Sequence, residues 1–274
     1  MTVARRESKP HNRPVDNTLW EQRIQRAEQL SAQHSFAADI LGFYIHVARF
    51  QQGLYERVSA NKTVISLSAP LEFPELLTSF PSFLALVEKK APLRLGEIGR
   101  EMRAQSFASS LELLTQCWSN IDSPDDPVEF LALAFLQPYA EFVRSQAQLQ
   151  LGGYNHMLCP FCNRKAAIGI LRQQGDGARR NLLCGFCLSE WEFRRIVCSG
   201  CGLEDQAKLP VYIADQFPHM RVEACDACKI YVKSVDLTKN GLANPLVDEL
   251  ASIPLDLWAQ ERGYAKVRPN LLGM

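Results

Sequence analysis

The sequence predicts an α+β fold with an N-terminal all-helical domain, two tandem four-cysteine modules and a C-terminal helix. Amphipathic runs at helical spacing fill the chain up to about residue 150. After Gly152-Gly153, short runs rich in β-branched and aromatic residues replace them. Four Cys-x-x-Cys motifs lie among these runs and contain eight of the nine cysteines. The helices, the strands and the cysteine spacing together indicate the α+β class.

The helical domain is expected over residues 18–150, after a polar N-terminus at 1–17 that is expected to be disordered. Thr18 and Glu21 fit a capping box at the start of the first helix. Asp126 followed by Pro127 predicts the start of a long apolar helix. Pro138 lies inside that helix and is expected to kink or split it, because proline has no N–H to donate. Other helical segments are expected at 40–58, 80–90, 94–103 and 106–119.

The first four-cysteine module is expected at residues 155–197 and the second at 198–238, with a C-terminal helix and tail at 245–274. Each cysteine motif lies between β-rich runs, as a zinc-ribbon or rubredoxin-like hairpin requires. The segment that leads into Cys184 aligns with the segment that leads into Cys225, so the two modules are interpreted as a duplication. Strands are expected at 168–172, 181–183, 190–197, 208–214, 221–224 and 230–235.

The paired cysteines predict two metal sites, because one tight turn can offer only two thiolates to a tetrahedral ion. The expected ligands are Cys159, Cys162, Cys184 and Cys187 for one ion, and Cys198, Cys201, Cys225 and Cys228 for the other. This sequential pairing closes two loops of nearly equal length, and interleaved pairing is the alternative. Each ion is iron, as in rubredoxin, or zinc. Four protein thiolates leave no position for water or substrate, so both sites are expected to be structural rather than catalytic.

The residue after the second cysteine of each motif should tolerate a left-handed backbone, so that amides can turn toward sulfur. Gly202 meets this need best, and Asn163 is the next most suitable residue. Leu188 and Lys229 fit a left-handed conformation poorly. The motifs that end at Cys187 and Cys228 are therefore expected to use a different turn.

The charge and the apolar runs of the sequence argue against several classes of protein. Thirty basic and thirty acidic residues give a formal net charge of zero, which argues against a dedicated binder of nucleic acid or anionic membranes. No apolar run is long enough to span a bilayer, and Arg5-Arg6 is not followed by the apolar segment of an export signal. A reducing compartment is therefore expected, where paired cysteines more often hold metal than form disulfides.

Two other functions are considered. Arginines between Arg172 and Arg195, with Phe186 and Trp191 nearby, could form a nucleic-acid-binding face of a tandem zinc-ribbon protein. The neutral net charge favours ordinary solvated arginines instead. A thiol–disulfide oxidoreductase would place its Cys-x-x-Cys at a helix N-terminus in a βαβ unit, and no such pattern surrounds these motifs. The remaining cysteine, Cys117, lies on an apolar helical face and is expected to be buried and inert.

The second half of the chain resembles the formate dehydrogenase accessory proteins, the FdhE family. The resemblance covers residues 157 to about 272. Its motifs are Cys159-Pro-Phe-Cys162, Cys184-Gly-Phe-Cys187-Leu-Ser-Glu190-Trp191, Arg195-Ile-Val-Cys198-Ser-Gly-Cys201, Glu223-Ala-Cys225-Asp-Ala-Cys228-Lys-Ile-Tyr231-Val-Lys233, and Leu255-Asp256-Leu-Trp-Ala-Gln-Glu261-Arg-Gly263-Tyr264. Asn163 and Ala166 depart from it, because the family usually has glycine and proline there.

The resemblance implies a cytoplasmic, non-enzymatic maturation factor for respiratory formate dehydrogenase. Such a protein is expected to bind the catalytic subunit of the dehydrogenase before its export, with no nucleic-acid partner and no insertion in the membrane. Rubredoxin-like iron is associated with the family's cysteine motifs. Because both metal sites are closed, the partner should contact surfaces that the modules position. The candidate partner-binding residues are Glu190, Trp191, Arg194, Arg195, Tyr231 and Lys233.

Overall fold

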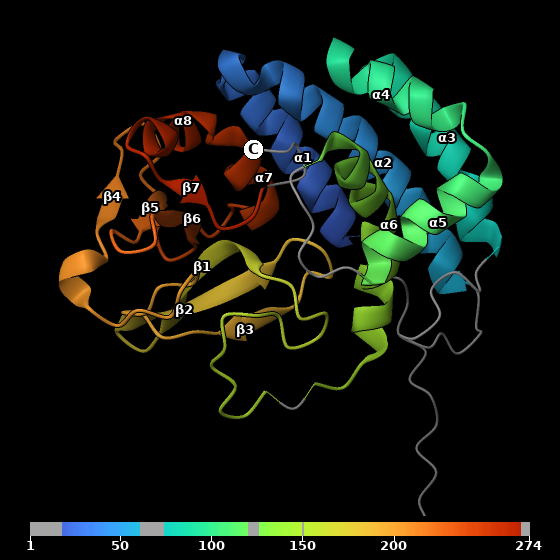
Figure 1. The fold of residues 1–274 in the computed structure, drawn as a ribbon. Helices are drawn as coiled ribbons and strands as arrows, with labels where there is room; N and C mark the ends of the chain where they lie inside the picture. Colours follow the sequence, from blue (N-terminus) through green and yellow to red (C-terminus); the bar gives the residue numbers. More distant parts are fainter. Residues whose placement is uncertain (1–17, 61–73, 120–125, 150, 270–274) are drawn as a thin grey trace, which may run out of the picture.

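The computed structural model describes residues 18–60, 74–119, 126–149 and 151–269. The expected disorder at 1–17 and the side chain of Thr18 in the expected capping box lie outside the described residues. Within them, the chain divides as the sequence predicts: helices come first, then a sheet with two groups of four cysteines, then C-terminal helices (Figure 1).

The N-terminal half consists of helices packed around an aromatic core. Phe135 lies at the centre of this core, with its ring centroid 4.8 Å from that of Phe80 and 5.7 Å from that of Phe83. All three rings are almost completely buried, so burial of apolar surface stabilises the bundle. The helices are α1 (Thr18–Gln33), α2 (Ala38–Ala60), α3 (Pro74–Lys90), α4 (Leu93–Arg103), α5 (Phe107–Ser119) and α6 (Pro127–Gln146).

Helix α6 begins as expected but does not split at Pro138. The carboxylate of Asp126 caps the helix by accepting a hydrogen bond from the backbone N–H of Val128. Because Pro138 has no N–H, the carbonyl of Ala134, one turn earlier, has no helical donor. The side chain of Gln51 on α2 supplies the missing donor, with Nε2 lying 2.6 Å from that carbonyl oxygen. The helix therefore continues through the proline, and the expected break does not occur.

Replacing Gln51 with alanine should lower the free energy of unfolding by about 1–3 kcal/mol, because a buried carbonyl would lose its only side-chain donor. The same amide also bonds Gln137, whose Nε2 donates to the carbonyl of Gly185 at 2.7 Å. Denaturant unfolding of the purified protein measures the loss. Gln52→Ala, one residue away on the same helix and partly exposed, is the matched control. Equal stability of the two variants would contradict the assignment.

The C-terminal half contains a single sheet of seven strands, in the order β3-β2-β1-β6-β5-β4, with β7 beside β6. The first module supplies β1 (Ala166–Gln174), β2 (Gly177–Cys184) and β3 (Glu190–Glu192). The second supplies β4 (Val211–Ile213), β5 (Met220–Ala224) and β6 (Ile230–Asp236). Pairs within a module are antiparallel, whereas β1 and β6 pair in parallel, with Ile168 opposite Lys233. The two modules therefore share one sheet and are not separate units.

The C-terminal segment differs from the single helix that the sequence predicts. It forms two short helices, α7 (Pro245–Ala251) and α8 (Ile253–Glu261), and then the strand β7 (Ala265–Lys266), which pairs in parallel with β6. Helix α7 packs against α1 and α2 through Val247, Leu250 and Ala251. It also packs on β1 and β6, so it fills the space between the helical half and the sheet (Figure 1).

Candidate metal centres

All four cysteine motifs use the same kind of turn. The residue after each second cysteine has a positive φ: 57° at Asn163, 57° at Leu188, 75° at Gly202 and 59° at Lys229. The expectation of a different turn at Leu188 and Lys229 is therefore wrong. The reason is a common backbone turn: the N–H groups of Asn163, Gly202 and Lys229 each donate to the backbone carbonyl of the first cysteine of their motif. The geometry of this turn overrides the preference of leucine and lysine for negative φ.

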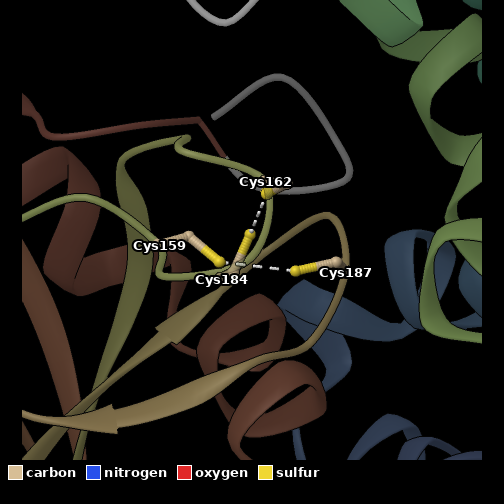
Figure 2. Close-up of side chains that lie close together, drawn as sticks. All are labelled: Cys159, Cys162, Cys184 and Cys187. Atoms are coloured by element: carbon tan, nitrogen blue, oxygen red, sulfur yellow. Dashed lines mark hydrogen bonds between the residues drawn. The ribbon is translucent and has the colours of Figure 1, made fainter. Parts of the chain in front are cut away.

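Cys159, Cys162, Cys184 and Cys187 form what we call the first cluster (Figure 2). The Sγ atoms of Cys159 and Cys187 are 3.5 Å apart, and those of Cys162 and Cys184 are 3.4 Å apart. The backbone N–H of Phe161 donates to Sγ of Cys159, and that of Phe186 donates to Sγ of Cys184, each at 3.4 Å. These amides favour sulfur in its thiolate form.

Cys198, Cys201, Cys225 and Cys228 form the second cluster. The Sγ atoms of Cys198 and Cys228 are 3.7 Å apart, and those of Cys201 and Cys225 are 3.9 Å apart. Sγ of Cys198 accepts from the backbone N–H groups of Gly200 at 3.3 Å and Cys201 at 3.4 Å. The structure therefore groups the cysteines sequentially, as expected, and not in the interleaved arrangement.

The geometry of both clusters fits a tetrahedral ion. A metal–sulfur bond of about 2.3 Å places the sulfurs of a tetrahedral site about 3.8 Å apart. The sulfurs of the four pairs described above lie between 3.4 and 3.9 Å apart, well beyond the disulfide bond length of about 2.05 Å. Each cluster can therefore bind one metal ion through four thiolates, with no ligand position left for water or substrate.

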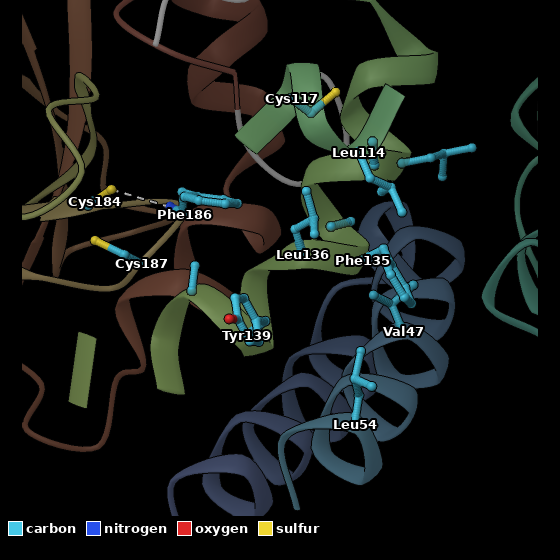
Figure 3. Close-up of a cluster of buried hydrophobic side chains, with 14 of the residues drawn as sticks. Val47, Leu54, Leu114, Cys117, Phe135, Leu136, Tyr139, Cys184, Phe186 and Cys187 are labelled. Atoms are coloured by element: carbon cyan, nitrogen blue, oxygen red, sulfur yellow. Dashed lines mark hydrogen bonds between the residues drawn. The ribbon is translucent and has the colours of Figure 1, made fainter. Parts of the chain in front are cut away.

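The two clusters differ in their surroundings. The first cluster belongs to the main hydrophobic core, where Cys159, Cys184 and Cys187 pack with residues of α5 and α6 (Figure 3). Arg164 is 2% exposed, lies over the ring of Phe186 at 4.1 Å and donates to the carbonyl of Cys117 on α5. In the second cluster Cys201 is exposed and Cys228 is half-buried. The first cluster is therefore part of the junction with the helical half, and the second lies toward solvent.

Three of the six candidate partner-binding residues are buried. Trp191 and Tyr231 are each 1% exposed, and Lys233 is 0% exposed. The indole N–H of Trp191 donates to the carbonyl of His156, and the hydroxyl of Tyr231 donates to Asp256 at 2.7 Å. The expectation that these three residues contact a partner is therefore wrong, because their side chains pack inside the molecule and do not form a contact surface.

The other three candidates are accessible to different degrees. Glu190 is half-buried and accepts two hydrogen bonds from Arg172. Burial alone would raise the pKa of Glu190, but the Arg172 guanidinium outweighs it and holds that pKa below its usual value. Arg194 is exposed and forms a bidentate pair with Glu204. Arg195 is also exposed, and its NH1 atom makes a long contact of 3.5 Å with the carbonyl of Ala178.

A buried ion network that the sequence analysis missed lies between β6 and the C-terminal helices. Nζ of Lys233 lies 3.0 Å from Oε1 of Glu249 and 2.5 Å from Oδ2 of Asp256. Lys266 on β7 pairs with the same two carboxylates. The signal in the sequence was a lysine within the largely apolar run 230–235. A lysine in such a run more often faces solvent from a strand.

The remaining cysteine and the histidines lie outside the clusters. Burial raises the pKa of the Cys117 thiol to about 12, consistent with the inert buried thiol expected from the sequence. His219 bonds Asp248 at 2.7 Å, and neither it nor His156 belongs to a group of candidate metal ligands among the described residues.

The described helices include none with the length and apolar character needed to cross a membrane. The longest of them, α2, carries charged residues along its length.

Fold and clusters together define a class of protein in which a helical bundle is joined to one sheet that carries two closed four-cysteine sites. Two family descriptions match adjoining segments of the chain: the FdhE central domain matches residues 158–195, and the FdhE C-terminal domain matches residues 196–272. These segments contain all eight clustered cysteines. The chain belongs to the FdhE family.

Individual relatives agree with this assignment. The FdhE homolog of Aquifex aeolicus is 29% identical over 224 residues, which cover 81% of this chain and 78% of the relative. The homolog of Pseudomonas putida is 26% identical over 284 residues, covering 93% and 87% of the two chains. The crystal structure of the FdhE protein from Pseudomonas aeruginosa has a TM-score of 0.67 at 24% identity and covers 96% of this chain and 98% of that one. The structural match supports the fold, including the helical half.

Proposed function

We propose that this chain is a non-enzymatic accessory factor for formate dehydrogenase. It acts in the cytoplasm and binds the catalytic subunit of the dehydrogenase before export. Membership of the FdhE family supports this function. The non-catalytic role is supported by the ligands of the two clusters, because cysteine occupies all four ligand positions in each. A metal held in this way has no free position at which a substrate could react.

We further propose that each cluster holds one iron or zinc ion. Cys159, Cys162, Cys184 and Cys187 would hold one ion, and Cys198, Cys201, Cys225 and Cys228 the other. Bound zinc would cross-link the chain, and bound iron would in addition allow one-electron transfer. The backbone amides of Phe161, Phe186 and Gly200 would stabilise the thiolates. Metal analysis of protein purified without oxygen distinguishes the two ions.

Co-purification tests the proposed function. The tagged chain should retain the catalytic subunit of formate dehydrogenase from the same cells, and a deletion strain should lose formate oxidation. Restoring the intact gene should restore it. Normal formate oxidation in the deletion strain, together with no retained catalytic subunit, would rule the proposal out.

A nucleic-acid-binding function is less well supported by the charges. Five arginines lie between Arg172 and Arg195, and four of them pair with glutamates: Arg172 with Glu190, Arg179 with Glu192, Arg180 with Glu223, and Arg194 with Glu204. Paired guanidinium groups are poor contacts for phosphate, because the carboxylate already offsets their charge. Binding of RNA or DNA that weakens steeply with salt would favour this alternative over the accessory function.

A further inference from the structure

A small cavity lined by arginines lies beside the second cluster. Its volume is about 40 Å³, and its walls include Arg180, Arg195, Arg221, Glu223, Cys198 and Val211. We call it the arginine pocket. The residues come from β2, from the loop that leads into the second cluster and from the end of the sheet formed by β4 and β5.

The arginine pocket contains more positive than negative charge. Arg180 and Arg221 both pair with Glu223, with nitrogen–oxygen distances of 2.5 Å in each pair. Three arginines therefore face one carboxylate, which gives an excess of two positive charges among these four side chains, and Cys198 lies in the same wall.

Arg180 is held firmly in the wall of the pocket. It is 2% exposed, and its NH1 atom donates to the carbonyls of Arg194 and Val197. Its Nε is buried and has no hydrogen-bond partner among the described residues. Arg195 has no carboxylate partner among the described residues and lies exposed at the rim.

One side of the rim of the pocket is apolar and lies at an open edge of the sheet. Strand β4 is the last strand in the order, so one side of its backbone has no neighbouring strand among the described elements. Val211 and Ile213 of β4 are 52% and 61% exposed. They lie opposite Glu223 and Arg221 in the register and therefore share the face of those two charged residues. An exposed apolar edge of this kind is a site where an extended peptide can add a strand.

We infer that the arginine pocket and β4 together bind an extended segment of the client protein. This segment carries an acidic residue between apolar residues. Its carboxylate enters the pocket, where the guanidinium groups offer forked donors, and its backbone runs along β4 with apolar side chains on Val211 and Ile213. The inference rests on the proposed function, since it takes the catalytic subunit of formate dehydrogenase as the client. The apolar rim favours a protein segment over a nucleic acid.

Replacing Arg195 with serine should weaken binding of the purified catalytic subunit about tenfold, because one unpaired charge at the rim is lost. Arg49→Ser is the control: Arg49 is an exposed arginine on α2 that pairs with Glu28 and does not line the pocket. Arg195→Lys should bind with intermediate strength, since lysine keeps the charge but loses the fork. Biolayer interferometry with the immobilised chain, at several salt concentrations, measures all four proteins.

A second variant tests the edge independently of the arginine. Val211→Asp places a carboxylate beside the pocket on an exposed position, so the fold should tolerate it. This variant should repel the acidic segment and weaken binding by at least tenfold, with unchanged metal content.

The outcomes separate the two proposals. If the wild-type chain does not bind the catalytic subunit, the proposed function fails. If the wild-type chain binds and Arg195→Ser and Val211→Asp bind equally well, only the docking surface is overturned. Loss of metal from Arg195→Ser would also overturn it, because the arginines would then serve to offset the negative charge of the thiolates at Cys198 and its cluster.

Discussion

Replacing Cys184 with serine should unfold most of the protein, whereas replacing Cys225 with serine should disrupt only the outer end of the sheet. Cys184 is 0% exposed and belongs to the core that α5 and α6 share with the first cluster. Loss of a structural metal site removes about 10 kcal/mol or more, which is comparable with the whole stability of a domain at about 5–15 kcal/mol. The second cluster contributes no cysteine to that core.

Metal content and protease resistance measure the difference. Cys225→Ser should retain one metal per chain and a protected helical half, with new cleavage sites between residues 198 and 229. Cys184→Ser should be degraded throughout, including residues 74–119. Cys117→Ser is the matched control, since Cys117 is also buried but lies outside both clusters, and it should retain two metals. Equal protection of the helical half in the two cluster variants would contradict the shared core.

This expectation differs from the one that the sequence alone supports. The hydrophobic pattern of the sequence gives the helical half its own stripes of leucine and phenylalanine. By that pattern alone, the helical half should stay folded when the metal is removed. The structure shows that Phe186, inside the second motif of the first cluster, packs edge-to-face against Trp118 of α5 with a centroid distance of 5.6 Å. Contacts between residues so far apart in the chain leave no periodic signal, so sequence reasoning could not find the shared core.

The cysteine clusters themselves could be predicted because their signal is local and chemical. Each Cys-x-x-Cys motif forms a turn that offers two thiolates, and a tetrahedral ion needs four. Four such motifs can therefore be paired around two ions in only a few ways. The parallel pairing of β1 with β6 could not be predicted, because it depends on which edges meet after each module has formed. The continuity of α6 through Pro138 could not be predicted for a similar reason: the donor to the carbonyl of Ala134, Gln51, lies on another helix.

The burial of Lys233 is the clearest failure of pattern reasoning. A single lysine in the run Ile230–Asp236 suggests an accessible position on a strand. The carboxylates that neutralise it lie on α7 and α8, at Glu249 and Asp256, and no spacing rule connects them to β6. Its role as a partner-binding residue was inferred because both metal sites are closed, so that a partner should contact surfaces that the modules position. That argument carries no information about which face of a strand is covered.

Replacing Lys233 with methionine should therefore destabilise the protein by about 3–5 kcal/mol, because it leaves two buried carboxylates with only Lys266 between them. Nζ of Lys233 also donates to the carbonyl of Glu249 at 2.6 Å and to Oγ of Ser252 at 3.1 Å, and methionine replaces neither bond. Lys208→Met is the matched control, since Lys208 is 57% exposed and forms only a surface pair with Asp205. That control should change stability by less than about 1 kcal/mol.

The pH dependence of the same pair of variants identifies the cause. Burial would raise the pKa of Glu249, but Lys233 and Lys266 outweigh it and hold that pKa at about 2. The unfolded chain has a glutamate pKa of about 4.3, so this carboxylate contributes stability that is fully present above that pH and is lost as the pH falls toward 2. The difference in unfolding free energy between wild type and Lys233→Met should thus be largest above pH ~4.3 and narrow below it. Denaturant titrations at several pH values measure this, and a difference that stays constant down to pH ~3 would mean that methionine acts by misfitting the core and not by removing a charge.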